Sequence, residues 1–296
     1  MIASESAETK LPKTWEANLL VAFLLPLVAF AAVLVAGLGL SYVLLLPQLL
    51  MILPALIWIL LRHYPLRQTL RLEVLPGRSA LWSAAIGLAC YPVAVGLASL
   101  IELGLKRIGP GPLPPAPATT LDTIAYAVVL IVVAPITEEP IFRGFVMSAW
   151  LRRGTVPGLV LSAFLFASVH FQIVALVPIA LLGMVFAFLV QRTGSLYSSI
   201  IAHACYNTLG ALFIIVPALR ESSEWPLIVA GCLALLPALL LLRSFARRHP
   251  ALPNALPTER TPRIWVILSL LVVVIILFVV AIGDIYVRLN PTGLGA

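Results

Sequence analysis

Charged side chains are scarce in this sequence. Asp, Glu, Lys and Arg make up 10% of the 296 residues, whereas 61% are hydrophobic, and the mean hydropathy is +1.09. Soluble globular proteins carry about 25% charged residues. This composition excludes a soluble domain and indicates an integral membrane protein.

Cysteine is also rare, and common catalytic signatures are missing. Cys90, Cys205 and Cys232 all lie in apolar runs without metal-type spacing, which excludes a disulfide framework and favours packing roles. The sequence has no GxSxG motif of a nucleophilic serine and no HExxH motif of a zinc protease. A hydrolase built on this chain therefore needs other residues.

Runs of about 20 apolar residues, long enough to cross the hydrocarbon core as helices, recur along most of the chain. We predict an all-α polytopic membrane bundle of eight to nine transmembrane helices around a buried polar cavity, as one membrane domain over residues 1–296. The shortest runs are the least certain as full crossings. The predicted spans are 18–38, 42–61, 80–102, 121–136, 156–171, 173–190, 196–216, 226–243 and 264–283.

The net charge of +7 is explained by membrane orientation rather than by nucleic-acid binding. Basic residues gather in alternate connections, and by the positive-inside rule this places the amino terminus in the cytoplasm. Nine crossings would place the carboxyl terminus outside, whereas eight would keep it inside. The clustered residues are Lys10, Lys13, Arg62, Arg67, Arg71, Arg78, Arg143, Arg152, Arg153, Arg192, Arg243, Arg247, Arg248, Arg260 and Arg263.

Two adjacent glutamates and an arginine interrupt one apolar run, in VVAPITEEPIFRG (132–144). A charge inside lipid costs roughly 2.5–3.5 kcal/mol, so these residues need a cavity or a partner. Glu139 and Arg143 are four residues apart and share a helix face, while Glu138 points about 100 degrees away. We expect Glu139 and Arg143 to pair and Glu138 to stay available.

Two prolines flank the glutamates and suggest an interrupted helix. Proline is tolerated in the first turn of a helix and disruptive in its interior. We expect one helix to end near Pro135 and another to begin with Thr137 as its N-cap, which places the glutamates in a first turn where the helix dipole favours negative charge. Broken helices at membrane depth line cavities, so this break points to a site.

Further polar residues lie in two later apolar runs: His170 in FASVH, and His203 with Asn207 in HACYN. His203 and Asn207 share a helix face. Each group alone could be an interhelical hydrogen bond, but together with the glutamates they suit amide hydrolysis. A carboxylate and an imidazole can activate water, and a second imidazole with a carboxamide can stabilise an oxyanion.

The same side chains could ligate zinc, because histidine and glutamate are ordinary zinc ligands. No ligand spacing is diagnostic, so from the residues alone the metal and metal-free versions both stay open.

The motifs EEPIFRG, FASVH and HACYN resemble, in order, the EExxxR, FxxxH and HxxxN/D motifs of the CAAX-protease and bacteriocin-processing family of intramembrane endopeptidases. The resemblance covers residues 120–216. It implies that Glu138 activates water with His170, that His203 and Asn207 stabilise the oxyanion, and that Glu139 and Arg143 shape the site. It also implies a membrane-anchored peptide or protein as substrate, with glutamic chemistry favoured, no cofactor favoured, and zinc as the alternative.

The function predicted is therefore an intramembrane endopeptidase of a bacterial inner membrane, working in the lipid bilayer and without nucleic acid. Two other classes stay open: a proton-coupled transporter, in which glutamates and histidines also occur in broken helices, and a non-catalytic bacteriocin-immunity protein. The predicted topology leaves His170 near the far end of its run. To reach Glu138, the 156–171 segment must be shorter, tilted or re-entrant, or run in the other direction.

Overall fold

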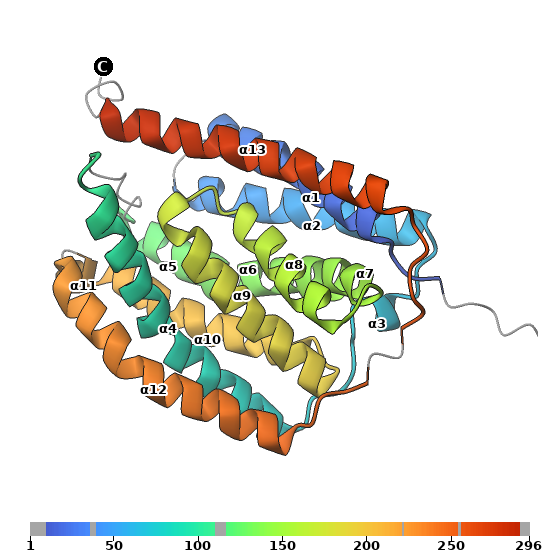
Figure 1. Ribbon diagram of the computed structural model, residues 1–296. Coiled ribbons are helices and arrows are strands. Elements are labelled where there is room, and N and C mark those ends of the chain that lie inside the picture. The colour runs from blue at the N-terminus through green and yellow to red at the C-terminus, as the bar shows by residue number, and fades with distance from the viewer. Residues whose placement is uncertain (1–9, 36–39, 110–116, 221, 254–255, 291–296) are drawn as a thin grey trace, which may run out of the picture.

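The computed structural model describes residues 10–35, 40–109, 117–220, 222–253 and 256–290, and in these ranges its regular structure is entirely helical (Figure 1). The all-α prediction is confirmed. The α-helices are α1 (Thr14–Val35), α2 (Leu40–Leu61), α3 (Leu66–Thr69), α4 (Gly77–Leu105), α5 (Thr120–Val128), α6 (Ala134–Glu139), α7 (Met147–Leu151), α8 (Thr155–Ser168), α9 (Ile173–Thr193), α10 (Tyr197–Ile215), α11 (Pro217–Arg220), α12 (Glu224–Arg248) and α13 (Arg263–Leu289). Two π-helical segments join them, η1 (Val129–Val133) and η2 (Pro140–Val146).

Seven stretches among the described residues are long and apolar enough to cross a membrane. Two apolar helices are shorter, Leu45–Leu61 and Thr155–Ser168. Helix α8 has 14 residues and rises about 21 Å, less than the roughly 30 Å hydrocarbon core. The predicted membrane bundle is confirmed, whereas the count of eight to nine full crossings is not. The long stretches are Thr14–Val35, Gly77–Leu105, Thr120–Leu151, Ile173–Thr193, Tyr197–Ile215, Glu224–Arg248 and Arg263–Leu289.

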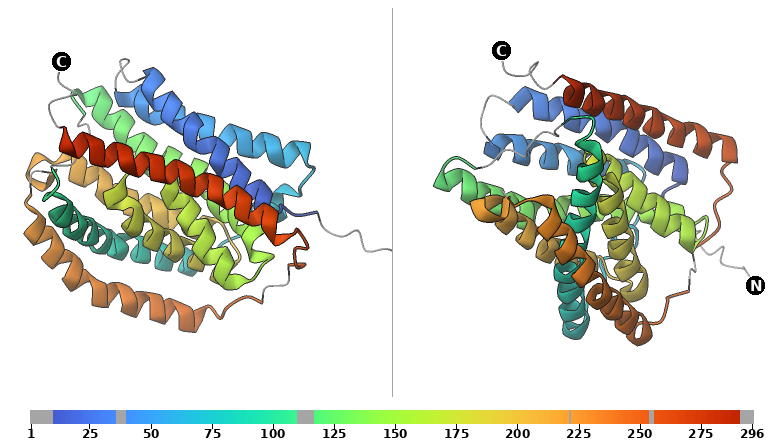
Figure 2. Two further views of the ribbon diagram at one scale, coloured as in Figure 1. Left: turned by 45° about the horizontal axis from the view of Figure 1, so that its top comes forward. Right: turned by 60° about the vertical axis from the view of Figure 1, so that its left-hand side comes forward.

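The helices lie in three groups (Figures 1 and 2). Helices α1, α2 and α13 form one side, α4, α10 and α12 form the other, and the segment from α5 to α9 runs between them, with α8 packed on α9. At the contact of α4 with α10, a Cβ on Gly87 would overlap the carbonyl oxygen of Ala202. The absent side chain lets α10, which carries His203, approach this closely.

Hydrogen bonds tie the basic connections together at one end of the bundle. The loop after α9 meets the loop before α4, where Ser195 Oγ donates to the carbonyl of Glu73 at 2.6 Å. The loop before α13 meets the end of α7, where Glu259 N donates to the carbonyl of Arg152 at 3.1 Å. Arg143 is the exception among the clustered basic residues, because it lies within η2 and its side chain is fully buried.

Helices α1 and α13 begin at this same end and run in parallel. Asn18 Nδ2, in the second turn of α1, donates to the carbonyl of Val266 and to Ser269 Oγ, both near the start of α13. The far end of α13 therefore lies at the opposite end of the bundle from the start of α1. Between the start of α1 and the far end of α13, the chain therefore passes from one end of the bundle to the other an odd number of times.

The helix break predicted near Pro135 is wrong. Helical geometry continues from Thr120 to Leu151 through η1, α6 and η2, so the glutamates lie in mid-helix rather than in a first turn. Thr137 is no N-cap, since its hydroxyl donates back to the carbonyls of Val133 and Ala134. The two prolines are accommodated because π turns, in which the hydrogen bond spans five residues, occur next to them.

Candidate active site

The first element of the site is a buried ion pair. Arg143 Nη1 donates to Glu139 Oε1 at 3.1 Å, and both side chains are 0% exposed. The guanidinium also donates to the carbonyl of Gly183 at 3.2 Å and lies 4.1 Å from the ring centroid of Phe166. The pairing predicted from the i, i+4 spacing is confirmed. Such contacts offset the cost of removing two charges from water.

His203, on α10, also binds Glu139. Its Nδ1 lies 2.8 Å from Glu139 Oε1, and its ring packs against the rings of Phe166 and Phe186. Because the carboxylate accepts, Nδ1 carries a proton. The other ring nitrogen, Nε2, points to the neighbouring glutamate, 3.9 Å from Glu138 Oε2. The two nitrogens of the His203 ring thus face two adjacent glutamates of one helix.

Glu138 has a different environment from Glu139. Gln48 Nε2, from α2, donates to Glu138 Oε1 at 2.7 Å, and Gln48 Oε1 accepts from the Thr137 hydroxyl at 2.5 Å. Among the described residues no hydrogen-bond partner is present for Glu138 Oε2, although the atom is buried. The distance of 3.9 Å to His203 Nε2 is too long for a hydrogen bond and suits a bridging water or substrate atom.

His170 follows the end of α8 and faces the same cluster. Its Nδ1 donates to the carbonyl of Phe166 at 3.0 Å, and its ring stacks edge-on against Phe166, 4.9 Å between centroids. The carbonyl can only accept, so Nδ1 holds the proton and Nε2 carries the lone pair. The His170 and His203 rings both pack edge-on against Phe166, which brings the two imidazoles to one aromatic side chain.

The short helix α8 places His170 beside the cluster of glutamates and His203. The helix stops at Ser168, and Phe171 then adopts φ 53°, in the left-handed region that a bulky residue rarely occupies. Of the alternatives left open for segment 156–171, the structure shows the shorter one, a helix of 14 residues.

Asn207 shares the face of His203 on α10 and holds a backbone carbonyl. Its Nδ2 donates to the carbonyl of Leu130 in η1 at 2.7 Å. In a π-helical register the partner of Leu130 would be Pro135, five residues later, which has no N–H. Asn207 therefore supplies the hydrogen bond that proline withholds. One of its two amide hydrogens is used in this way.

Sequence reasoning missed Gln48 and predicted no role for Phe166, the first residue of the FxxxH motif. Gln48 is a single amide in an apolar run beside Pro47, and an unexplained polar residue at that depth was the available signal. Phe166 contacts Arg143, His170 and His203, yet it looks like an ordinary core residue in the sequence. Its role as a shared packing surface came only from the fold.

Metal donors are limited in this cluster. Within the described ranges, no three side chains of His, Cys, Asp or Glu converge in a group that could hold a metal ion. The nearest set is Glu138 with His203 and His170. Nδ1 of His170 is committed to a carbonyl and Nδ1 of His203 to Glu139. Only the Nε2 atoms of these rings would be free to ligate.

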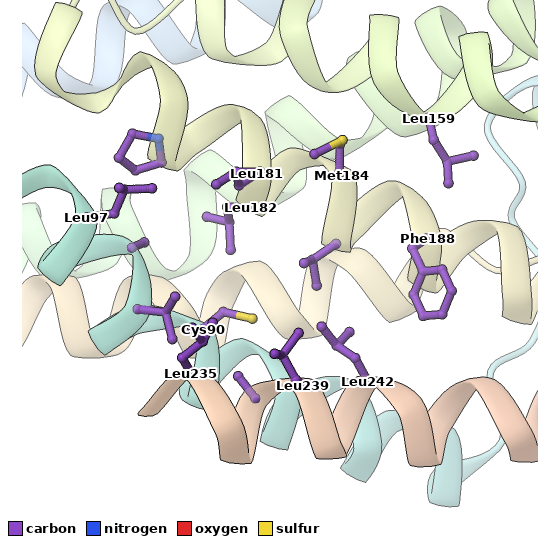
Figure 3. A pocket seen from close by; sticks show the side chains of 15 residues that line it. Cys90, Leu97, Leu159, Leu181, Leu182, Met184, Phe188, Leu235, Leu239 and Leu242 are labelled. Carbon is purple, nitrogen blue, oxygen red and sulfur yellow. The ribbon is translucent and has the colours of Figure 1, made fainter. Parts of the chain in front are cut away.

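An apolar groove of about 460 Å³ lies between α4, α9 and α12, outside the charged cluster (Figure 3). Leu181, Met184 and Val185 of α9 line it, whereas Gly183 and Phe186 of the same helix contact Arg143 and His203. Helix α9 thus separates the groove from the polar residues. Cys90 lines the groove, but the lining residues that the structure describes include no histidine, carboxylate or lysine that could activate its thiol, so the groove is a poor catalytic centre.

Comparison with known proteins bears on this arrangement. Residues 120–209, which include all three motifs, match the model of the family described as type II CAAX prenyl endopeptidase Rce1-like. This region of the chain is similar to that family. The family resemblance predicted from the motifs is confirmed.

A curated relative agrees with this assignment. Over 165 residues the chain is 30% identical to a Bacillus subtilis (strain 168) protein named "Putative membrane peptidase YdiL". The match covers 52% of this chain and 66% of that protein, slightly less than two thirds of its length. No solved structure matches. The helices before residue 120 and after 209 lie outside the Rce1-like match.

Proposed function

We propose that this protein is an intramembrane endopeptidase that hydrolyses a peptide bond in a membrane-anchored peptide or protein. The observation that carries the proposal is the unequal surroundings of two adjacent glutamates. Glu139 is held by the Arg143 guanidinium and by His203, whereas Glu138 accepts a hydrogen bond from the neutral amide of Gln48 and lies 3.9 Å from His203 Nε2. One oxygen of each carboxylate, Oε2, lacks a hydrogen-bond partner among the described residues. A buried carboxylate that no guanidinium holds is available as a general base. The Rce1-like match supports the same reaction class.

Water activation is assigned to Glu138 with His170. Glu138 Oε2 and His170 Nε2 are both acceptors that can take a proton from water. The water oxygen forms a bond to the carbonyl carbon, and its proton passes to the base. The proton then passes to the amide nitrogen as the C–N bond breaks. Gln48, bonded to the other oxygen of Glu138, orients the carboxylate for this step.

Stabilisation of the oxyanion of the tetrahedral intermediate is assigned to His203 and Asn207. His203 Nδ1 is already a donor to Glu139, so Nε2 can donate only when the ring carries both protons. The carboxylates on either side of the ring can balance that charge. Asn207 contributes its second amide hydrogen, since the first is held by Leu130. Glu139 and Arg143 fix the position of His203.

The chemistry is proposed to need no metal, with zinc as the alternative. Glu138 and the two Nε2 atoms would be the ligands if zinc were bound, and the metal would then polarise the scissile carbonyl and lower the pKa of water. Removal of metal separates the two versions. The metal-free version predicts that a strong chelator leaves cleavage unchanged.

The membrane setting is proposed from the charge distribution. The basic end of the bundle, with the starts of α1 and α13, faces the cytoplasm of a bacterial inner membrane. The parallel course of α1 and α13 places the far end of α13 outside. The substrate reaches the cluster from the bilayer, because the residues that surround it lie in membrane-spanning helices.

The test is cleavage of a panel of membrane-anchored peptides by the purified protein in detergent, read by mass spectrometry of the products. Wild type, Glu138→Gln and His170→Ala are compared, each with and without a chelator. Cleavage lost in both variants and unaffected by the chelator supports the proposal. Cleavage lost to the chelator and restored by zinc replaces it with a metalloprotease.

Cleavage that survives both substitutions would overturn the assigned site. If no peptide of the panel is cleaved, proton-coupled uptake in vesicles is measured instead. Uptake that depends on Glu138 would favour the transporter. With neither activity, binding of a membrane peptide unchanged by Glu138→Gln would favour the non-catalytic immunity protein.

A further inference from the structure

Two adjoining hollows lie at the basic end of the bundle, where α1 and α13 begin. The first, of about 930 Å³, is polar and is formed by the segments before these helices together with Arg152. The second, of about 490 Å³, is apolar and follows α1 and α13 into the bundle, lined by Leu19, Trp265, Leu268 and other side chains. Trp15 and Thr261 line both hollows, so they form one continuous surface.

The polar hollow carries an excess of positive charge. Lys10, Lys13, Arg152 and Arg260 line it, against a single carboxylate, Glu259. That carboxylate is already engaged, because it accepts from the backbone N–H of Thr14 and from Arg153. Arg152 donates to three backbone carbonyls, which hold the guanidinium in place without neutralising it. In the described part of the chain, Lys10, Lys13 and Arg260 have no ion-pair partner.

The start of α13 also favours an anion, whereas the start of α1 is already occupied by a carboxylate. The first N–H group of α1, that of Thr14, donates to both carboxylate oxygens of Glu259. Helix α13 begins after Pro262 without a side-chain cap. Free N–H groups at a helix start favour an anion. The hollow therefore combines unpaired cations with an uncapped start of a 27-residue helix.

The apolar hollow lies on the outer, lipid-facing side of the bundle. Trp265 is 60% exposed, Leu268 44% and Val272 42%, although all three belong to a membrane-spanning helix. From Trp265 to Val272 the helix rises about 10 Å, the depth of the first part of an acyl chain. Tryptophans at this level are typical of the membrane interface. The groove therefore suits a hydrocarbon chain.

We propose that the two hollows together bind one anionic phospholipid, with its headgroup phosphate among Lys10, Lys13, Arg152 and Arg260 and an acyl chain in the groove between α1 and α13. This site is separate from the glutamate cluster and independent of the proposed peptidase activity. A soluble anion lacks the acyl chain, and an uncharged lipid lacks the headgroup charge. Only an anionic lipid uses both hollows.

The test is native mass spectrometry of the full chain in detergent, titrated with dioleoyl phosphatidylglycerol or with dioleoyl phosphatidylcholine. Wild type should bind the first molecule of the anionic lipid more tightly. Each interfacial cation contributes about fivefold to the affinity. Lys10→Gln with Lys13→Gln and Arg260→Gln should therefore weaken anionic lipid binding by on the order of 100-fold at low salt and leave phosphatidylcholine nearly unchanged.

A matched control removes three other exposed arginines at the same end of the bundle, as Arg78→Gln, Arg243→Gln and Arg247→Gln, and should change binding far less. Trp265→Ala with Leu268→Ala should weaken both lipids, because the groove loses its walls. Circular dichroism confirms that each variant is folded. Equal binding of the two lipids by wild type, equal effects of the two triple variants, or unchanged binding after the groove substitutions would each overturn the proposal.

Discussion

Substituting each of the two adjacent glutamates by glutamine should separate catalysis from stability. Glu139→Gln leaves Arg143 fully buried without its carboxylate partner, and removing one member of a buried pair costs about 3–5 kcal/mol. Glu138→Gln keeps an oxygen that can accept from Gln48, so its cost is about 1 kcal/mol. Glu138→Gln should nevertheless have the direct effect on catalysis. Loss of a general base lowers the cleavage rate roughly 100- to 10,000-fold in a protein that is still folded.

The assay is unfolding in mixed detergent micelles, followed by circular dichroism, beside the initial rate of peptide cleavage. The variants control for each other, because they differ by one position on the same helix. Adding Arg143→Met to Glu139→Gln should recover part of the lost stability, because it removes the uncompensated charge. The reasoning is refuted if Glu138→Gln destabilises the protein as much as Glu139→Gln, or if Glu138→Gln is folded and fully active.

Three further predictions concern the supports of the site. Gln48→Leu removes the hydrogen bond that orients Glu138 and should lower the initial cleavage rate on the order of 10- to 100-fold with little change in melting temperature; an unchanged rate would contradict the orienting role. Gly87→Ala introduces a Cβ that overlaps the carbonyl of Ala202 and should cost about 1–3 kcal/mol in micelle unfolding, whereas Gly104→Ala, which has no neighbour within 4 Å, should cost much less. Burial and its hydrogen bond to Glu16 raise the pKa of the Tyr64 phenol from 10.0 to about 12, so the stability it contributes is complete below about pH 10 and lost towards pH 12; Tyr64→Phe should remove this part of the pH dependence of the melting temperature.

The sequence was sufficient to predict which polar residues gather. A charge or histidine in an apolar run needs a partner at the same depth, so Glu139 with Arg143 and the approach of His203 followed from cost and spacing. The need to bring His170 to Glu138 limited segment 156–171 to a few alternatives, of which the short helix α8 was one. These inferences worked because few polar residues were available, which left few ways to combine them.

What the sequence could not show depends on the backbone register. The prolines predicted a break with Thr137 as N-cap, because an α-helical hydrogen-bond pattern cannot continue through proline. A π turn shifts that pattern by one residue, and nothing local in the sequence distinguishes a π turn from a break. Gln48 was missed for a related reason, since its partner lies 90 residues away and becomes a neighbour only when α2 packs against α6.

The π turns also explain how the first and third motifs are joined. Pro135 withholds the N–H that a π-helical register would direct to the carbonyl of Leu130, and Asn207 of the third motif occupies that carbonyl. Four residues earlier on the same face of α10, His203 binds Glu139 of the first motif. The helix of the glutamates and the helix of His203 are therefore joined at two points one turn apart, and this fixes both the separation and the rotation of the two helices. His203 cannot then turn towards Glu139 alone, so its second nitrogen stays near Glu138 Oε2.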